Sequence, residues 1–337
     1  MFRSKITGLG FFVPENIVSN DDLSKLMETS DDWISERTGI KNRRWVNDKK
    51  LTTSLMGTYA AKKAIADAGI DKNDIDFIIF STLSPDYYFP GSGVLLQRNL
   101  GIKEIGALDV RNQCSGFIYG LSIADQYIKS GMYKNILLVG SEIHSGGLDK
   151  STKGRSVSVI FGDGAGAAVI SSTKSENGIL STHLHSEGKY AEELAVIKPA
   201  TTHWIDKIKS DQTDESYWPY MNGNFVFKNA VVRFEQVIKE GLEYSNLNID
   251  DISLLIPHQA NLRISQFIQK KLKLSDSQVF NNIMKYGNTT AASIPIALTE
   301  AYQSNLIKKN DIVVLAAFGS GFTWGSAVIK WLSLIHI

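Results

Sequence analysis

The only cysteine of the chain, Cys114, lies where an extended segment gives way to a helical one. Residues 107–110 are strand-like, and apolar side chains then recur at helical spacing from Phe117 to Ile128. A thiol at a helix N-terminus lies near the positive end of the helix dipole, which lowers its pKa and favours the nucleophilic thiolate. The position therefore suits covalent catalysis, and a buried cysteine that packs as a small apolar side chain is the alternative.

Two further residues occupy similar places. His258 ends the apolar segment 254–257 and precedes a predicted helix, and Asn288 lies in a loop ahead of a helical segment at 291–302. Strand ends that face helix starts are where α/β folds place their chemistry. Cys, His and Asn in this order fit two chemistries: a papain-like hydrolase, with histidine as base and asparagine as its orienter, or a condensing enzyme with an acyl-cysteine.

Other candidate motifs are weaker. The glycines of residues 162–167 lead into another strand-like segment rather than a helix. Tight strand-to-strand turns, with the backbone approaching a neighbour closely, are therefore favoured over a nucleotide site. His183 and His185 alternate along a strand and share a face, but they lack a third zinc ligand. We expect no metal site, and we interpret the remaining histidines as surface or core residues: His144, His203 and His336.

Composition limits the function classes. The chain has 337 residues, 43% of them hydrophobic and 21% charged, with a net charge of +1, so nucleic acid is not an expected partner. A single cysteine excludes an internal disulfide and fits a reducing cytoplasm. The first residues do not resemble a signal peptide, and no apolar run reaches 18 residues, so we expect a cytoplasmic protein that does not contact a membrane.

The elements that must position these residues alternate between strands and helices. Near-continuous apolar runs at 77–81, 135–140, 158–161 and 167–170 indicate strands covered on both faces. Segment 64–80 reads helix, turn, strand, as does 241–257, and 159–170 has a counterpart in 316–329. This internal repeat predicts two halves, 1–172 with the cysteine and 173–337 with His258 and Asn288, and a loop-rich insertion at about 188–220.

Five motifs in order resemble those of β-ketoacyl-acyl-carrier-protein synthase III, a thiolase-like condensing enzyme family, at 114–117, 162–167, 257–264, 286–293 and 318–325. The resemblance runs from about Lys5 to Trp331. It implies a five-layered αβαβα fold of two duplicated halves, a homodimer, and no cofactor. The implied reaction is a decarboxylative Claisen condensation of an acyl-CoA primer with malonyl-acyl-carrier protein. Its product, 3-oxoacyl-acyl-carrier protein, initiates fatty acid synthesis.

The resemblance also implies a role for each matching residue. Cys114 carries the acyl group, His258 Nε2 and the Asn288 amide stabilise an enolate, and the backbone N–H groups of Cys114 and Ser320 form an oxyanion hole. Phe318 shields the decarboxylation pocket, and Phe89 closes the partner's acyl pocket. Further matches hold CoA and its pantetheine arm, namely Trp33, Arg37, Arg155, Gly223, Asn224 and Asn261. A basic face matches the site of the acidic carrier protein, namely Lys228, Arg263, Lys270 and Lys271.

Two departures leave the substrate open. Arg111, Asn112 and Gln113 precede the cysteine where housekeeping members have small apolar residues, and residues 81–90 look like relatives of secondary metabolism. A pathway-specific acyltransferase with a different primer or acceptor is therefore the alternative, and a cysteine hydrolase is a third. The sequence does not name the primer or its length.

Overall fold

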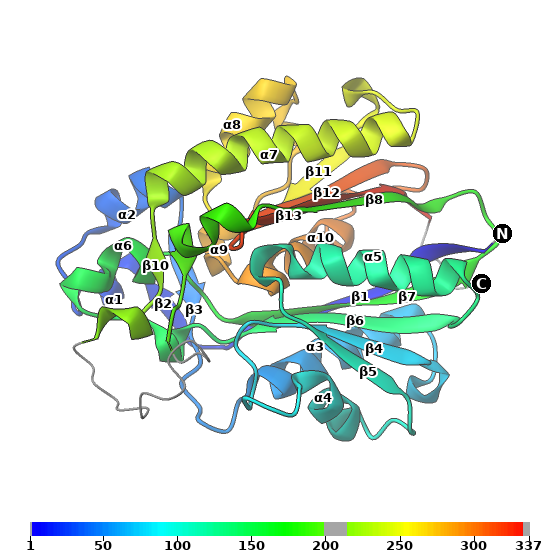
Figure 1. The fold of residues 1–337 in the computed structure, drawn as a ribbon, viewed down its shortest axis with the longest axis horizontal. Coiled ribbons are helices and arrows are strands. Elements are labelled where there is room, and N and C mark those ends of the chain that lie inside the picture. Colours follow the sequence, from blue (N-terminus) through cyan, green and yellow to red (C-terminus); the bar gives the residue numbers. More distant parts are fainter. Residues whose placement is uncertain (1, 199–213, 333–337) are drawn as a thin grey trace.

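Apolar strands form two sheets, which lie one above the other in Figure 1 with helices between and outside them. The structure is a computed structural model and describes residues 2–198 and 214–332. The first sheet has the order β1-β7-β6-β4-β5, with β1 (Arg3–Phe12), β7 (Gly164–Thr173), β6 (Asn135–Glu142), β4 (Phe77–Ser81) and β5 (Gly106–Val110). The second has the order β11-β12-β13-β8, with β11 (Leu254–Pro257), β12 (Ile312–Gly319), β13 (Thr323–Lys330) and β8 (Gly178–Ser186).

Three helical layers bury the faces of these sheets. The outer face of the first sheet is covered by α3 (Thr53–Ala68) and α4 (Ser92–Leu100). Between the sheets lie α5 (Gly116–Lys129) and α10 (Ser293–Gln303), and α7 (Gly223–Tyr244) and α8 (Leu262–Leu272) cover the outer face of the second. Strands covered on both faces must be apolar throughout, which explains the continuous apolar runs of the sequence.

The two sheets repeat one topology. The order β8-β13-β12-β11 of the second matches β1-β7-β6-β4 of the first, and each parallel pair lies beside an antiparallel one. A parallel bridge between Leu255 and Val279 occupies the place that β5 has beside β4. All strands of the first sheet precede residue 174, and all strands of the second follow residue 177. The exact division into halves at 172/173 remains our prediction.

Glycines allow helices to lie close to the first sheet. A Cβ at Gly8 in β1 would lie 2.2 Å from the carbonyl oxygen of Ala64, and one at Gly166 in β7 would lie 2.7 Å from Pro295. Close backbone approach to α3 and α10 therefore requires these glycines. The close backbone approach predicted for the glycines at 162–167 is thus confirmed, whereas the predicted turn is wrong for Gly164 and Gly166, which lie within β7.

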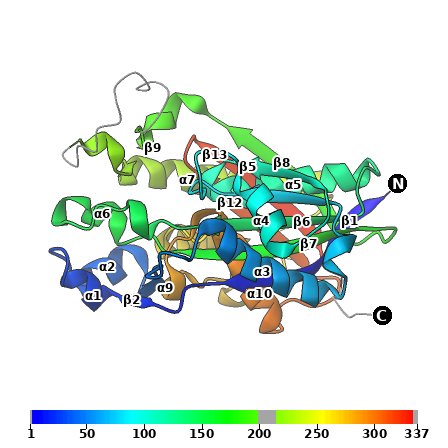
Figure 2. The same cartoon turned by 90° about the horizontal axis from the view of Figure 1, so that it is seen from below.

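Shorter elements gather at one end of the molecule (Figures 1 and 2). They are β2 (Ile17–Ser19), α1 (Asn20–Ser24), α2 (Asp31–Thr38), β3 (Asn42–Arg44), α6 (Arg155–Ser158), β9 (Leu194–Ala195), β10 (Tyr220–Met221) and α9 (Ile283–Tyr286). The strand predicted at 158–161 is wrong, since α6 and a turn occupy that segment. Within the described part of the chain, no helix is both long and apolar enough to cross a membrane.

Candidate active site

A cavity of about 550 Å³ brings together side chains from both halves of the chain. Cys114, His258 and Asn288, which are separated by up to 174 positions in sequence, all line it. Trp33 and Arg37 also line it, at the end of the molecule where α2 lies. The cavity therefore joins the three predicted catalytic residues to the predicted CoA contacts.

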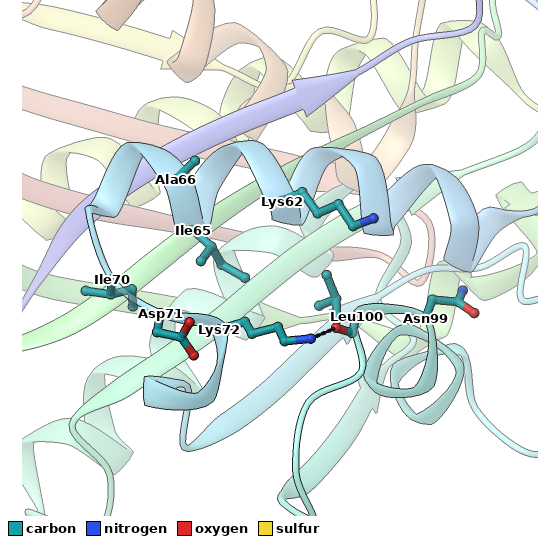
Figure 3. A pocket seen from close by; sticks show the side chains of 8 residues that line it. All are labelled: Lys62, Ile65, Ala66, Ile70, Asp71, Lys72, Asn99 and Leu100. Atoms are coloured by element: carbon teal, nitrogen blue, oxygen red, sulfur yellow. Dashed lines mark hydrogen bonds between the residues drawn. The ribbon is translucent and has the colours of Figure 1, made fainter.

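A second hollow, of about 410 Å³, lies on the outer helical layer between α3 and α4 (Figure 3). Lys72 Nζ donates to the Leu100 carbonyl at 2.8 Å across it. None of the three predicted catalytic residues is among its lining residues. The chemistry of the chain therefore points to the first cavity.

Cys114 occupies a sharp strand-to-helix turn. β5 ends at Val110, a short 3-10 turn spans Gln113–Ser115, and α5 begins at Gly116, as the sequence predicts. Gln113 has φ of 43°, a left-handed conformation that a non-glycine residue adopts at a cost of about 1 kcal/mol. The turn places the thiol at the head of α5, with the residue 8% exposed.

The electrostatics of this thiol differ from the sequence expectation. Desolvation is the main cause that raises the pKa of Cys114 to about 12, and the neighbouring Glu142 carboxylate acts in the same direction. The backbone N–H groups of Cys114 and Ser320 oppose this rise by hydrogen bonding. The prediction of a lowered pKa is therefore wrong, because burial outweighs the helix dipole.

Those two N–H groups are the ones expected to form the oxyanion hole. Ser320 is held beside Cys114 by a relay in which Ser115 Oγ lies 2.7 Å from Thr323 Oγ1, which donates to the Ser320 carbonyl at 3.0 Å. A Cβ at Gly319 would lie 2.6 Å from the Cys114 Cβ, so only glycine fits there. The relay and the close contact fix the Ser320 N–H against the sulfur.

The side chain of Ser320 has its own contact. Its hydroxyl donates to the carbonyl oxygen of Leu194 in β9, and Leu194 lines the cavity. The insertion at about 188–220 thus contributes a wall of the site through β9 and β10. Leu194 and Met221 are pocket residues that sequence reasoning missed, because that segment has no strong pattern of its own.

His258 follows β11 directly and is 3% exposed. Its Nδ1 lies 2.6 Å from Ser293 Oγ, and the Gln259 backbone N–H donates to the same hydroxyl at 3.4 Å. A hydroxyl that accepts from Gln259 is free to donate its own proton to Nδ1, and in that arrangement the imidazole proton is on Nε2. Nε2 has no hydrogen-bond partner among the described residues, and desolvation lowers the pKa of His258 to about 3. The ring is therefore neutral, and in that tautomer Nε2 is a free donor on the side away from Ser293.

The amide of Asn288 is oriented by the backbone. Its Oδ1 accepts from the Thr290 N–H at 2.8 Å, while its own N–H and carbonyl bond to Ile160 and Gly162 at 2.9 and 3.0 Å. With Oδ1 occupied, the Nδ2 donors are the end of the amide left for a ligand. Asn288 is 5% exposed and lines the cavity. Two N–H donors, on His258 and Asn288, are thus available near one thiol.

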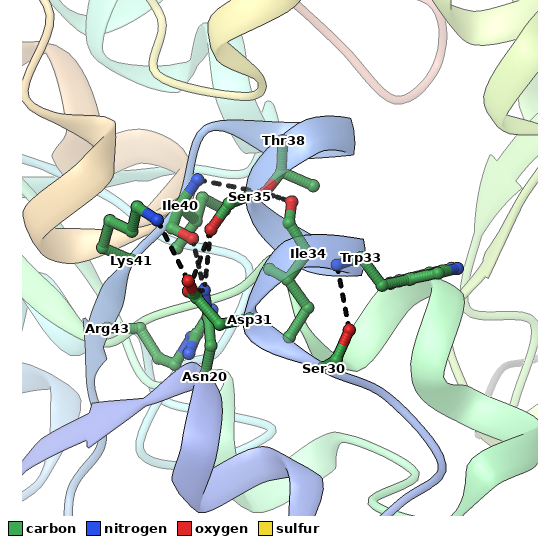
Figure 4. Close-up of polar contacts among 10 residues, drawn as sticks. All are labelled: Asn20, Ser30, Asp31, Trp33, Ile34, Ser35, Thr38, Ile40, Lys41 and Arg43. Carbon is green, nitrogen blue, oxygen red and sulfur yellow. Dashed lines mark hydrogen bonds and ion pairs between the residues drawn. The ribbon is translucent and has the colours of Figure 1, made fainter.

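An aromatic platform lies at the entrance. The guanidinium groups of Arg37 and Arg155 lie 4.6 and 5.0 Å from the centre of the Trp33 ring. The two guanidinium groups supply positive charge beside an aromatic ring, which are the features that a planar, anionic ligand requires. Helix α2 that carries Trp33 and Arg37 is held by polar contacts around Asn20, whose amide bonds to Asp31 at 2.7 Å (Figure 4).

Most of the other predicted contacts lie along the same cavity. Gly223, Asn224 and Asn261 line it, and Asn261 Nδ2 donates to the Arg37 carbonyl at 2.9 Å. Phe318 is 4% exposed, lines the cavity, and packs on Phe322 with ring centres 4.8 Å apart. Two predicted substrate residues, Arg155 and Phe89, are not among the residues that line the cavity. Arg155 contacts the lining residue Trp33.

The predicted basic face lies on α7 and α8, with all four side chains exposed: Lys228, Arg263, Lys270 and Lys271. Arg263 also lines the cavity entrance, and Lys271 Nζ forms an ion pair with Glu235 at 2.5 Å. Phe89 is 80% exposed at the tip of a loop. Its predicted role across a dimer interface therefore needs a second chain.

Among the remaining histidines, His183 and His185 share a face as predicted, since both contact Glu240, at 3.3 and 2.6 Å. The described residues include no group of three or more His, Cys, Asp or Glu that could hold a metal ion. His203 and His336 lie outside the described residues.

Comparison with known proteins identifies the family. Residues 108–188 match the model of 3-oxoacyl-[acyl-carrier-protein] synthase III, and residues 242–331 match its C-terminal model. The β-ketoacyl-[acyl-carrier-protein] synthase III of Caldanaerobacter subterraneus is 44% identical, over 97% of each chain. The chain belongs to the 3-oxoacyl-[acyl-carrier-protein] synthase III family.

Other synthase III proteins are similar to this chain along nearly its whole length. One from Vibrio vulnificus is 45% identical over 97% of this chain and 99% of its own. The crystal structure of the Aquifex aeolicus synthase III is 41% identical with a TM-score of 0.89, and covers 97% of this chain and 100% of that one. The predicted family, thiolase-like fold and acyltransferase class are confirmed. A priming β-ketosynthase of a polyketide pathway is more distant, at 29% identity with a TM-score of 0.88.

Proposed function

We propose that this synthase III transfers an acyl group from acyl-CoA to Cys114 and condenses it with malonyl-acyl-carrier protein, as the first condensation of fatty acid synthesis. The family membership confirms the condensation reaction predicted from the motifs. The observation that carries the residue roles is the cavity, which brings a thiol, two backbone donors and two side-chain donors together behind a cationic aromatic entrance.

In the first half-reaction, the Cys114 sulfur attacks the thioester carbonyl and the carbon–sulfur bond to CoA breaks. The proton lost by Cys114 ends on the CoA thiol. The N–H groups of Cys114 and Ser320, which already bond to the sulfur, stabilise the negative charge that develops on the carbonyl oxygen. Losing one such donor typically costs about 3–4 kcal/mol of transition-state stabilisation.

In the second half-reaction, the malonyl group loses carbon dioxide and its electron pair forms an enolate. A neutral His258 with its proton on Nε2 and the Asn288 Nδ2 group donate hydrogen bonds to the enolate oxygen. The enolate carbon attacks the acyl-cysteine, and the released Cys114 thiolate takes up a proton. Phe318, buried beside Phe322, limits the access of water to the carbanion.

The proposed partner is an acidic carrier protein, and the proposed compartment is the cytoplasm. The exposed cations of α7 and α8 lie beside the entrance and suit an acidic carrier protein that delivers its substrate there. The reaction requires no cofactor besides these substrates. A single free cysteine fits the reducing environment of the cytoplasm, which is the proposed compartment.

The half-reactions can be tested separately. After incubation with a short acyl-CoA, the intact protein should gain one acyl mass, whereas Cys114→Ala should gain none. His258→Ala and Asn288→Ala should still be acylated but should release carbon dioxide from malonyl-acyl-carrier protein more slowly by orders of magnitude. An acylated Cys114→Ala protein, or a variant of His258 or Asn288 that loses acylation and decarboxylates normally, would overturn the assignment. Steady release of free acid without decarboxylation would indicate a hydrolase.

A further inference from the structure

Asn288 is presented to the cavity by a residue in an unfavourable backbone conformation. Thr290, whose N–H holds Asn288 Oδ1 at 2.8 Å, has φ of 51°. A β-branched residue rarely adopts this left-handed conformation, because its side chain crowds the backbone there. The surrounding structure must therefore hold Thr290 in place if its N–H is to keep pointing at Asn288.

One side chain of the described residues makes a hydrogen bond with the Thr290 hydroxyl: the imidazole of His144, whose Nε2 lies 2.5 Å from Thr290 Oγ1. His144 follows the end of β6, and its backbone N–H donates to Asp163 Oδ1 at 2.7 Å. Asp163 is itself buried and accepts from Ser145 as well. The imidazole is thus anchored to the first sheet, independently of the loop that carries Asn288.

His144 also reaches the other side of Asn288. Its ring packs on Phe161, with ring centres 4.8 Å apart and planes at 39°. Phe161 pairs with Asn288 in a parallel β-bridge and lines the cavity. His144 is not itself a lining residue, so it touches both neighbours of Asn288 without touching the ligand space.

We propose that His144 is a positioning residue, which holds Thr290 and Phe161 so that Asn288 presents its Nδ2 donors rather than Oδ1 to the enolate. This inference rests on the proposed role of Asn288 in decarboxylation. A reversed amide would place an acceptor oxygen against the developing negative charge and would oppose the reaction. Burial lowers the pKa of His144 to about 4, so the ring is neutral at physiological pH and adds no charge to the site.

The test uses two variants that each remove one end of the contact. His144→Phe keeps a ring on Phe161 but removes Nε2, and Thr290→Val keeps the shape but removes Oγ1. Each should slow carbon dioxide release from malonyl-acyl-carrier protein by about tenfold, the effect of one side-chain hydrogen bond. Acylation of Cys114, followed by intact mass, should change less than about twofold. Thr290→Ser, which keeps the hydroxyl, should retain the decarboxylation rate.

The double variant gives the decisive comparison. If the two side chains act through one contact, His144→Phe with Thr290→Val should be no slower than the slower single variant. Parallel losses in acylation and decarboxylation, or a double variant whose loss is the product of the two single losses, would overturn the proposal. If His144→Phe fails to fold, the decarboxylation rates of Thr290→Val and Thr290→Ser test the proposal. A slow Thr290→Val and a normal Thr290→Ser support it, and equal rates overturn it.

Asn288→Ala separates this inference from the proposed function. If Asn288→Ala loses decarboxylation while His144→Phe and Thr290→Val decarboxylate normally, only the positioning role is wrong. If Asn288→Ala itself decarboxylates normally, the role of Asn288 fails and the positioning proposal fails with it.

Discussion

At the scale of single residues, opposed effects act on the pKa of Cys114, and the larger one prevails. The head of α5 and two N–H donors favour the thiolate of Cys114, whereas burial and Glu142 favour the thiol. Desolvation can shift a buried group by several pKa units, and the pKa of about 12 shows that it prevails. The thiol is therefore the favoured form of Cys114 at neutral pH.

This leads to a pH prediction for alkylation of Cys114. With a pKa of about 12, the thiolate fraction rises about tenfold for each pH unit between 7 and 9. The rate of inactivation by iodoacetamide should rise by the same factor, without a plateau below pH 9, and acyl-CoA should protect. Rates measured on the wild-type protein at fixed ionic strength check this. A plateau near pH 7 would show that the helix dipole prevails instead.

At the scale of elements, helices α7 and α8 place a basic face beside the cavity entrance. They contact each other through the Phe227 and Phe267 rings, whose centres are 6.1 Å apart, and Arg263 lies at the rim of the cavity. Because the cations are exposed, each surface pair is weak in isolation, but several together raise the association rate of an acidic partner.

Charge reversal on this face should affect the carrier protein and spare the primer. Lys228→Glu with Lys270→Glu, two exposed residues outside the cavity lining, should raise KM for malonyl-acyl-carrier protein about tenfold or more, an effect that shrinks at high salt. Acylation by acyl-CoA should change less than about threefold. Lys62→Glu, on the opposite outer layer, is the matched control and should change neither. Equal losses with both substrates would mean that the face does not recognise the carrier protein.

At the scale of the whole molecule, the first sheet ends in an exposed edge. β5 is the last strand of its sheet, and Tyr87, Tyr88 and Phe89 nearby are 53, 67 and 80% exposed. Exposed strand edges and aromatic groups are features that natural proteins usually cover. A second copy of the chain is the partner that would cover both, in keeping with the homodimer expected from the family.

The dimer prediction is tested through Phe89. If this side chain closes the partner's acyl pocket, Phe89→Ala opens room for several methylene groups, each worth about 0.8 kcal/mol when buried. The variant should prefer longer acyl-CoA primers in the mass-based acylation assay, and wild type should be a dimer by light scattering. A monomeric wild-type protein, or an unchanged chain-length preference, would show that the pocket is closed differently.

The sequence determined what depends on local pattern and ordered motifs. The strand–cysteine–helix unit, the position of His258 after an apolar strand, and the αβαβα fold could all be predicted, because continuous apolar runs and five motifs constrain them. Errors occurred where local patterns are ambiguous: residues 158–161 are apolar but partly helical, and the glycines of β7 serve helix contact rather than a turn.

Only the tertiary structure decided the quantities that depend on burial and on contacts between distant segments. The pKa of Cys114 reflects its removal from water by layers from both halves, which a helix dipole argument omits. The contact of His144 with Thr290 joins residues 146 positions apart, so it has no local signal in the sequence that would predict a role for His144. Local sequence specifies elements, whereas dielectric environment and side-chain partners arise when the two sheets and their helices come together.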